Sequence, residues 1–361
     1  MINVGTADAL PPALLSIVAH DGRPSCGVRD HAAGLTRCVA SEGVHAEMRV
    51  LDWRRVGFGR SLRELRNDLR ARQPRHILLH HSHLAWSRRG LPVGFLAVFF
   101  LCRSAAPTTV WVHDPCAIGD RKVRHRLATA AKGAAMRLAF RLGRGIVVAV
   151  DPSAVYWLRG PGPRVLFQPS TGPVDRNAWE PPIEPFTVAC FAQAHYSYED
   201  DRRLVKLATL LRDEIGPFHL RLLGDGTVST QFSHQLADLD ITIECPGYLN
   251  SESLAQALRT SHAFLMTRGP LSSRNSSVAA ALACGLPVFG FTGIETSMGL
   301  RRAASVAQLS DLKLLVTQLA ALSDDPALGH ARSAQSHALF DSVYDWKVVA
   351  PRLLAFLNHV R

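Results

Sequence analysis

Residues 262–293 read HAFLMTRGPLSSRNSSVAAALACGLPVFGFTG, and this stretch decides the fold. The runs 263–267 and 287–291 are short and apolar, as buried parallel strands are. Between them, VAAALAC is a helix-forming run that follows several residues suited to a helix N-cap. A strand, a helix and a second strand in this order predict one β-α-β unit of a parallel sheet.

The same alternation extends outward from this unit. In the second half, strands are expected at 187–191, 219–223 and 241–245, with helices at 200–214, 251–261 and 276–284. In the first half, strands are expected at 14–19, 46–51, 76–80, 109–113, 145–150 and 164–168, with helices at 28–41, 61–72, 92–102 and 123–142. Residues 175–185, DRNAWEPPIEP, contain three prolines and interrupt the pattern.

We therefore predict an α/β protein of two Rossmann-like, doubly wound domains that face each other across a cleft. The expected N-terminal domain covers 1–174, the linker 175–185 and the C-terminal domain 186–344, while a last helix over 345–361 packs back on the first domain. In such sheets ligands bind beyond the carboxyl ends of the strands, so the cleft is the expected site.

The composition of the chain argues against several other classes of protein. The chain is 47% hydrophobic and 20% charged, as globular enzymes are. Its seven cysteines form no CxxC pair, which argues against a disulfide framework or a structural zinc site and favours a reducing compartment. The start has no basic segment before its apolar residues, and the longest apolar run, 91–102, is shorter than a bilayer span. We expect a cytoplasmic protein.

Charge divides the chain into two unlike halves. Up to Asp175 there are 25 Lys and Arg against 12 Asp and Glu, and beyond it 16 against 18. A basic first domain favours an anionic partner, either an anionic membrane surface or a lipid-diphosphate acceptor. The segment 87–103, apolar between arginines, is interpreted either as a buried helix or as a face that enters a membrane surface. Zinc-finger spacing and aromatic RNA-binding motifs are absent from the sequence, so no nucleic-acid partner is expected.

The start of the helix near Ser276 is the clearest candidate for an anion site. Asn275, Ser276 and Ser277 are good N-cap residues, and a helix N-terminus directs backbone N–H groups and a positive dipole at whatever lies before it. Arg274 adds a forked cation suited to phosphate. The alternative is an ordinary capped helix with Arg274 in solvent.

These motifs together resemble the GT-B glycosyltransferases, and among them the retaining enzymes of glycosyltransferase family four. GDG at 224–226, the Gly-containing loop in ECPGYLNSESLAQAL at 244–258 and ALACGLPVFGFTG at 281–293 resemble the donor-binding domain. SCGVRDHAAGLTRCVASEG at 25–43, VWVHDP at 110–115 and FQPSTGPV at 167–174 resemble parts of the first domain.

The resemblance implies transfer of a sugar from a nucleotide-sugar donor to a glycan or lipid-linked acceptor, in polysaccharide or glycolipid biosynthesis and with retention. It implies neither a metal nor another cofactor. The donor-binding candidates are Gly27, Gly224, Tyr248, Leu249, Arg274, Asn275, Ser276 and Ser277. His113 and Asp114, at the carboxyl end of a strand, are the catalytic candidates.

The sequence departs from the family at two positions. Many members carry two glutamates around the donor-site helix, where this chain has Ser272 and Ala280. A related subset is similar to this chain in having Arg followed by Ser or Thr, so Arg274, Ser276 and Ser277 are expected to hold the diphosphate. The missing carboxylates also favour a second hypothesis, a non-catalytic GT-B subunit that binds a glycan or a protein.

Histidines at 80, 81 and 83 are the remaining signal. Such a group is typical of metal sites, but neighbouring strand residues point to opposite faces, so His80 and His81 are not expected to share an ion. We expect no metal there and favour a lining of the acceptor pocket.

Overall fold

The protein is described by a computed structural model that covers residues 11–20, 26–82, 85–86, 92–115, 123–191, 198–224 and 230–360. The chain forms two compact units, Met1–Gln168 together with Val349–Arg361, and Pro169–Val348. The division therefore falls before the segment 175–185, where the linker was expected. That segment is bound to the second unit, because Asn177 N donates to Ala283 O at 2.9 Å and Trp179 Nε1 to Ser261 O at 2.8 Å.

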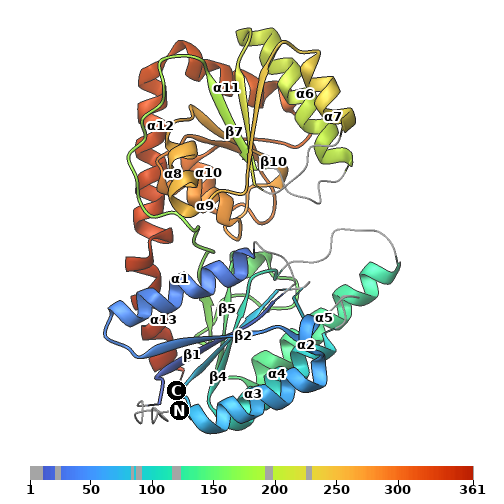
Figure 1. Ribbon diagram of the computed structural model, residues 1–361, viewed down its shortest axis with the longest axis vertical. Coiled ribbons are helices and arrows are strands. Elements are labelled where there is room, and N and C mark those ends of the chain that lie inside the picture. The colour runs from blue at the N-terminus through green and yellow to red at the C-terminus, as the bar shows by residue number, and fades with distance from the viewer. Residues whose placement is uncertain are drawn as a thin grey trace, which may run out of the picture. The chain divides into compact units, whose positions relative to one another are not determined.

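The sheet of the first unit has six parallel strands in the order β2-β1-β3-β4-β5-β6 (Figure 1). They are β1 (Leu14–Ala19), β2 (Ala46–Leu51), β3 (Ile77–His81), β4 (Thr108–Val112), β5 (Gly145–Val148) and β6 (Val165–Phe167). The four central strands are buried along their whole length, as the apolar runs of the sequence predict for a sheet covered on both faces.

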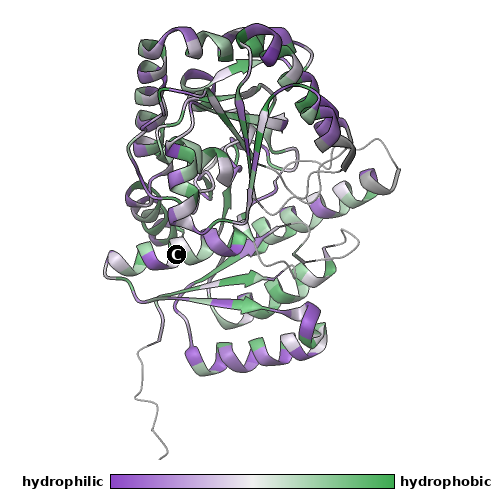
Figure 2. Ribbon diagram, turned by 45° about the horizontal axis from the view of Figure 1, so that its top comes forward, coloured by the Kyte–Doolittle hydropathy of each residue, from purple (hydrophilic) through white to green (hydrophobic). Residues whose placement is uncertain are grey.

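Helices cover both faces of this sheet. They are α1 (Gly27–Ser41), α2 (Trp53–Val56), α3 (Phe58–Arg72), α4 (Val93–Ala105), α5 (Val123–Leu142) and α13 (Trp346–His359). Leu65 of α3, Phe95 of α4 and Met136 of α5 share one apolar core with the strands. On α3 only a narrow stripe is buried, and Figure 2 shows the rest of that helix to be largely hydrophilic.

The sheet of the second unit is also parallel and six-stranded, in the order β12-β11-β10-β7-β8-β9. Its strands are β7 (Thr187–Phe191), β8 (His219–Leu223), β9 (Thr242–Gly247), β10 (Ala263–Pro270), β11 (Val288–Phe291) and β12 (Ser305–Ala307). Its helices are α6 (Tyr198–Ile215), α7 (Thr230–Ala237), α8 (Ser251–Arg259), α9 (Ser276–Ala283), α10 (Met298–Ala303), α11 (Leu312–Asp324) and α12 (Pro326–Leu339), followed by a π turn over Phe340–Tyr344.

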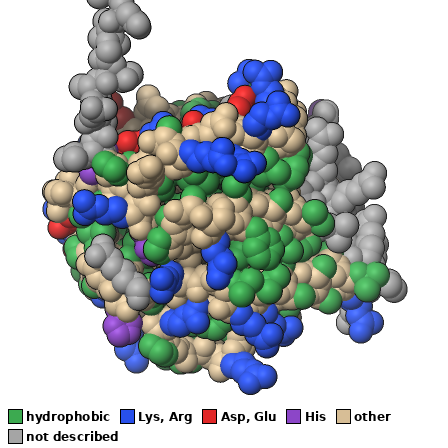
Figure 3. Space-filling model, turned by 90° about the horizontal axis from the view of Figure 1, so that it is seen from below, with side chains coloured by type: hydrophobic (Ala, Val, Ile, Leu, Met, Phe, Trp, Pro, Cys, Tyr) green, Lys and Arg blue, Asp and Glu red, His purple; other side chains and the backbone are tan. Residues whose placement is uncertain are grey.

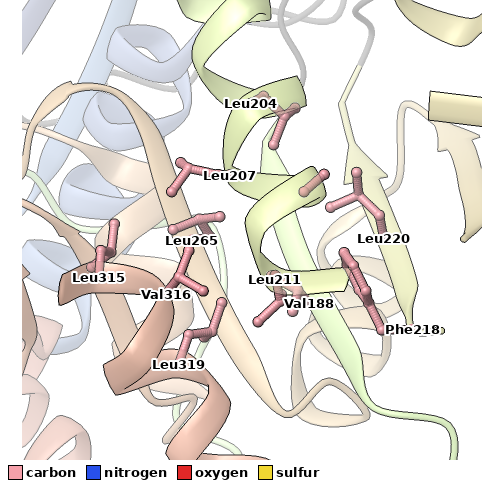
Figure 4. A pocket seen from close by; sticks show the side chains of 11 residues that line it. Val188, Leu204, Leu207, Leu211, Phe218, Leu220, Leu265, Leu315, Val316 and Leu319 are labelled. Atoms are coloured by element: carbon pink, nitrogen blue, oxygen red, sulfur yellow. The ribbon is translucent and has the colours of Figure 1, made fainter. Parts of the chain in front are cut away.

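Two apolar cores hold the second unit together, one on each face of its sheet. Figure 4 shows the side chains of α6 and α11 converging on β7, β8 and β10 in one of them. The gap that they leave is about 10 Å³, which is about the space of one water molecule, so this region is packing and not a ligand site.

Most of the expected elements are present, and β1, β2, β7 and β8 have the expected bounds. The helices α2, α7 and α10 and the strand β12 were not expected; α2, α10 and β12 have six residues or fewer, too few to establish a periodicity. Among the described residues, none of the helices has the length and apolar character of a membrane span.

Candidate active site

The start of α9 lies at the carboxyl end of β10, as the β-α-β unit requires. Asn275 is the N-cap residue, but its Oδ1 accepts from Ser272 N at 2.9 Å, so the side chain folds back over the loop. Ser276 and Ser277 begin the helix and are half-buried. The amides of this first turn therefore point past the helix start, where an anion would be stabilised by them and by the helix dipole.

Arg274 is exposed, but its side chain is held by an ion pair. Its Nε lies 2.7 Å from Oε2 of Glu295, and the Glu295 side chain is largely buried. Glu295 belongs to the loop between β11 and α10, and this loop is ordered because Thr296 Oγ1 donates to Leu271 O at 2.7 Å. The structure thus brings a carboxylate to the expected anion site, which the sequence analysis did not include.

A second glycine-rich corner lies at the ends of β8 and β9. Gly224 N donates to Gly247 O at 3.2 Å, and both glycines have positive φ, which favours glycine over other residues. Tyr248 is 63% exposed, while Leu249 packs against the core formed with α8 and α9. These expected donor residues therefore form one corner at the carboxyl edge of the sheet, with an exposed aromatic ring.

Arg203 of α6 was not among the candidates named from the sequence. Its Nη1 donates to Thr267 O at 2.8 Å and to Asp200 Oδ1 at 3.0 Å, and its guanidinium lies 5.7 Å from the ring centre of Phe291. It therefore adds a cation beside Thr267 of β10 and Phe291, the last residue of β11.

In the first unit, His113 and Asp114 directly follow β4. His113 is 5% exposed, its N donates to His81 O at 2.9 Å, and its Nε2 lies 2.9 Å from Nδ1 of His80. Burial lowers the pKa of His113 to about 4, although the nearby Asp114 carboxylate opposes the shift. Asp114 is half-buried and accepts from Ser82 Oγ at 2.9 Å.

The rings around His113 form a layered cluster. The rings of His80, Trp111 and His113 are nearly parallel, with ring centroids 5.2–5.8 Å apart. The ring of His31 in α1 is edge-on to that of His113, with their centroids 5.0 Å apart. Burial lowers the pKa of His80 well below its usual value, and the neighbouring His113 and His31 add to this effect. The rings of His80 and His113 are therefore neutral imidazoles at neutral pH. Asp114 is the more exposed of the two catalytic candidates.

Gly27 is the first residue of α1 and is exposed, after the buried N-cap Cys26. The residues just before it, 21–25, lie outside the described part of the chain. Gly27 therefore occupies the helix start that the glycine turn of the sequence predicts, at the carboxyl end of β1.

His80 and His81 point to opposite faces of the sheet, as alternation predicts, because His80 stacks on Trp111 whereas His81 contacts Phe95. His83 lies outside the described residues. Within the described ranges, no three His, Cys, Asp or Glu side chains are grouped as metal ligands.

No family model and no curated protein sequence matches the chain. Solved structures do. The crystal structure of Anabaena HepE with UDP and glucose is 12% identical, with a TM-score of 0.65 over 96% of this chain and 99% of that one. WaaG, a glycosyltransferase involved in lipopolysaccharide biosynthesis, is 12% identical, with a TM-score of 0.62 over 95% and 98%.

A mutant of S. aureus TarM in complex with fondaparinux, alpha-GlcNAc-glycerol and UDP is 11% identical, with a TM-score of 0.60 over 78% of this chain. The chain covers 55% of TarM, or about half of its length. The predicted fold class is thereby confirmed: the chain has the GT-B fold of these glycosyltransferases, with two Rossmann-like parallel sheets.

Proposed function

We propose that the chain is a glycosyltransferase that transfers a sugar from a nucleotide-sugar donor to a glycan or lipid-linked acceptor in polysaccharide or glycolipid biosynthesis. The observation that carries this proposal is the start of α9, where first-turn amides and Arg274 meet at the carboxyl edge of a Rossmann-like sheet. The GT-B fold supports it, since structural neighbours were solved with UDP.

The diphosphate of the donor is assigned to Arg274, Asn275, Ser276 and Ser277. A guanidinium has five N–H donors, so one arginine can bind a carboxylate and a phosphate at the same time. Glu295 then fixes the orientation of Arg274 through the 2.7 Å contact, and the amides of α9 supply the remaining donors. This arrangement stabilises the negative charge that grows on the leaving diphosphate during transfer.

The remaining contacts to the donor are assigned to residues at the carboxyl edges of the two sheets. We assign the nucleobase to the corner that contains Gly224, Tyr248 and Leu249. The exposed ring of Tyr248 can stack on a base, and the main-chain groups around Leu249 and Gly224 can hydrogen-bond with it. The start of α1 at Gly27 is a second source of amide donors for phosphate. A metal is not required in this scheme.

Asp114 is the group that we assign to the reacting hydroxyl or the transferred sugar. His113 is buried against His80 and stays neutral at neutral pH, so its part is to hold the loop in place. The leaving phosphate accepts the proton of the acceptor hydroxyl in a same-face attack, which gives retention. A carboxylate at Asp114 stabilises the positive charge that develops on the sugar.

An anionic membrane surface is the proposed setting. Figure 3 shows a face where Lys and Arg side chains alternate with apolar ones and acidic side chains are few. On α4, Val93 is 69% and Phe100 is 46% exposed. Along α3 the arginines 60, 63, 66, 70 and 72 are exposed. Such a basic and apolar surface suits a lipid-linked acceptor at the inner face of a cytoplasmic membrane.

The test is binding of nucleoside diphosphates, followed by transfer or slow hydrolysis with a panel of nucleotide sugars. We expect at least one nucleoside diphosphate to raise the melting temperature and Arg274→Ala to abolish that shift. Glu295→Gln keeps an oxygen for Arg274 but removes a negative charge near the phosphates, so its binding should equal or exceed that of the wild type.

The competing hypothesis, a non-catalytic subunit that binds a glycan or a protein, predicts a different result. It requires that no nucleotide or nucleotide sugar changes the melting temperature and that none is hydrolysed. That outcome would remove the transferase proposal.

A further inference from the structure

The loop His113–Asp114–Pro115 is held by side chains from several separate elements. His80 of β3 contacts the His113 ring at 2.9 Å, and Ser82, just after β3, donates to Asp114 Oδ2 at 2.9 Å. Trp157, which follows β5, donates from Nε1 to Pro115 O at 2.8 Å. Every residue of this short loop therefore contacts a side chain from another segment of the first unit.

Lys132 of α5 also contacts this loop, because its Nζ donates to the main-chain oxygen of Asp114. Lys132 is only 2% exposed, and lysine is among the residues least often found fully buried. Burying an ammonium costs free energy unless it is hydrogen-bonded. Methionine would fill the same space without that cost, so packing alone does not require lysine at this position.

The neighbourhood of Lys132 is rigid. The next residue is Gly133, and a Cβ there would lie 2.9 Å from the ring of Tyr156, so α5 and the segment after β5 approach closely. The Tyr156 hydroxyl donates to Thr129 O at 2.6 Å and joins the same two elements. Lys132 and Trp157 thus contact the loop from one closely packed support.

Of the two candidate catalytic side chains in this loop, that of Asp114 is the more accessible. His113 is buried and its Nε2 is engaged with His80, whereas the Asp114 carboxylate is half-buried and lies beyond the end of β4. Holding a main-chain oxygen fixes the Cα of the same residue, and so limits where its carboxylate can lie. A displacement of about 1 Å at a reacting group can lower a rate by about 100-fold.

We infer that Lys132 is a positioning residue, which fixes the Asp114 carboxylate for sugar transfer through the main-chain oxygen of the same residue. This inference rests on the proposed function for its catalytic part. Its structural part, the ordering of the loop by Lys132, can be measured without any substrate.

The kinetic test is a double-mutant cycle of Lys132→Met and Asp114→Asn. Lys132→Met is expected to lower kcat about 10- to 100-fold, with KM for the donor and nucleoside diphosphate binding unchanged, because the diphosphate is assigned to the starts of α9 and α1 and not to the loop that Lys132 contacts. The double variant should be no slower than Asp114→Asn alone, because both substitutions remove the same function, that of the positioned Asp114 carboxylate. Losses that multiply, or a folded Lys132→Met protein with wild-type kcat, would overturn the inference.

The second test is hydrogen exchange of the full chain, which needs no activity. In Lys132→Met the peptide containing His113 and Asp114 should exchange at least about tenfold faster than in the wild type, while β1 and β7 are unchanged. Unchanged exchange in that peptide would refute positioning. If the wild type transfers or hydrolyses no sugar, the proposed function fails, and this exchange result still decides whether Lys132 orders the loop.

Controls separate positioning from a general loss of stability. Lys347→Met removes an exposed lysine and should change neither kcat nor exchange. If Lys132→Met does not fold, Ser82→Ala and Trp157→Phe each remove one contact to the same loop. Each should lower kcat with unchanged KM and speed exchange of the same peptide, and wild-type behaviour of both would contradict the inference.

Discussion

At the scale of single residues, the buried histidines of the first unit couple its stability to pH. His80 and His113 have lowered pKa values because burial disfavours their charged forms. Above their ordinary pKa of about 6.5, both rings are neutral in the folded and the unfolded chain, so the full stability is present. Below it the unfolded chain binds protons first, which favours unfolding.

We therefore predict that the free energy of unfolding falls as the pH drops from about 6.5 towards 4. The slope should be about 1.4 kcal/mol per pH unit for each such histidine. Denaturant unfolding at a series of pH values measures it. His113→Asn should flatten the slope, whereas His359→Gln, at an exposed histidine, should not. A pH-independent stability over this interval would contradict the assigned burial of the imidazoles.

At the scale of elements, the start of α9 is positioned by the segment that leads into the second unit. Ser170 N donates to Ser273 O at 3.0 Å, and Gly172 lies directly on α9. A Cβ at Gly172 would lie 2.7 Å from Ala280 N and 2.8 Å from Ser276 O. Because both are backbone atoms, the helix itself would have to move.

Gly172→Ala is therefore predicted to destabilise the protein by about 1–3 kcal/mol, as overpacking does. It should also weaken nucleoside diphosphate binding, since the amides of α9 are displaced. Thermal unfolding and calorimetric titration measure the two effects. Gly162→Ala is the matched control, because a Cβ there meets nothing within 4 Å. Equal behaviour of the two variants would show that α9 has room to adjust.

The elements could be predicted because apolar runs and N-cap residues are local signals. The apolar run before Arg274 predicted where β10 begins, although the strand continues three residues further than expected, to Pro270. The serines after Arg274 predicted α9 to within one residue. Glu295 could not be found in this way, because its pairing with Arg274 depends on β11 lying beside β10. The same holds for Lys132, whose contact with Asp114 arises only when α5 packs on the sheet.

At the scale of the whole molecule, charge is distributed unevenly between the two halves of the chain. The excess of Lys and Arg lies before residue 175, and exposed arginines at 63, 66 and 70 follow one side of α3. Each Lys or Arg close to an anionic membrane contributes roughly 1 kcal/mol of attraction at low salt. Exposed Phe100 of α4 adds an apolar contact of the kind that interfacial proteins use.

Replacing Arg63, Arg66 and Arg70 by Ser should therefore weaken binding to vesicles that contain phosphatidylglycerol by roughly 100-fold, with little change for pure phosphatidylcholine. Co-sedimentation with the two vesicle types at low and high salt measures this. The matched control replaces Lys206, Arg302 and Lys313 by Ser. These are three exposed positions of the second unit, and the change removes the same amount of charge. If both triple variants lose binding equally, net charge alone attracts the protein to lipid. A loss confined to the first set means that the α3 surface makes the contact, and it would support the proposed lipid-linked acceptor.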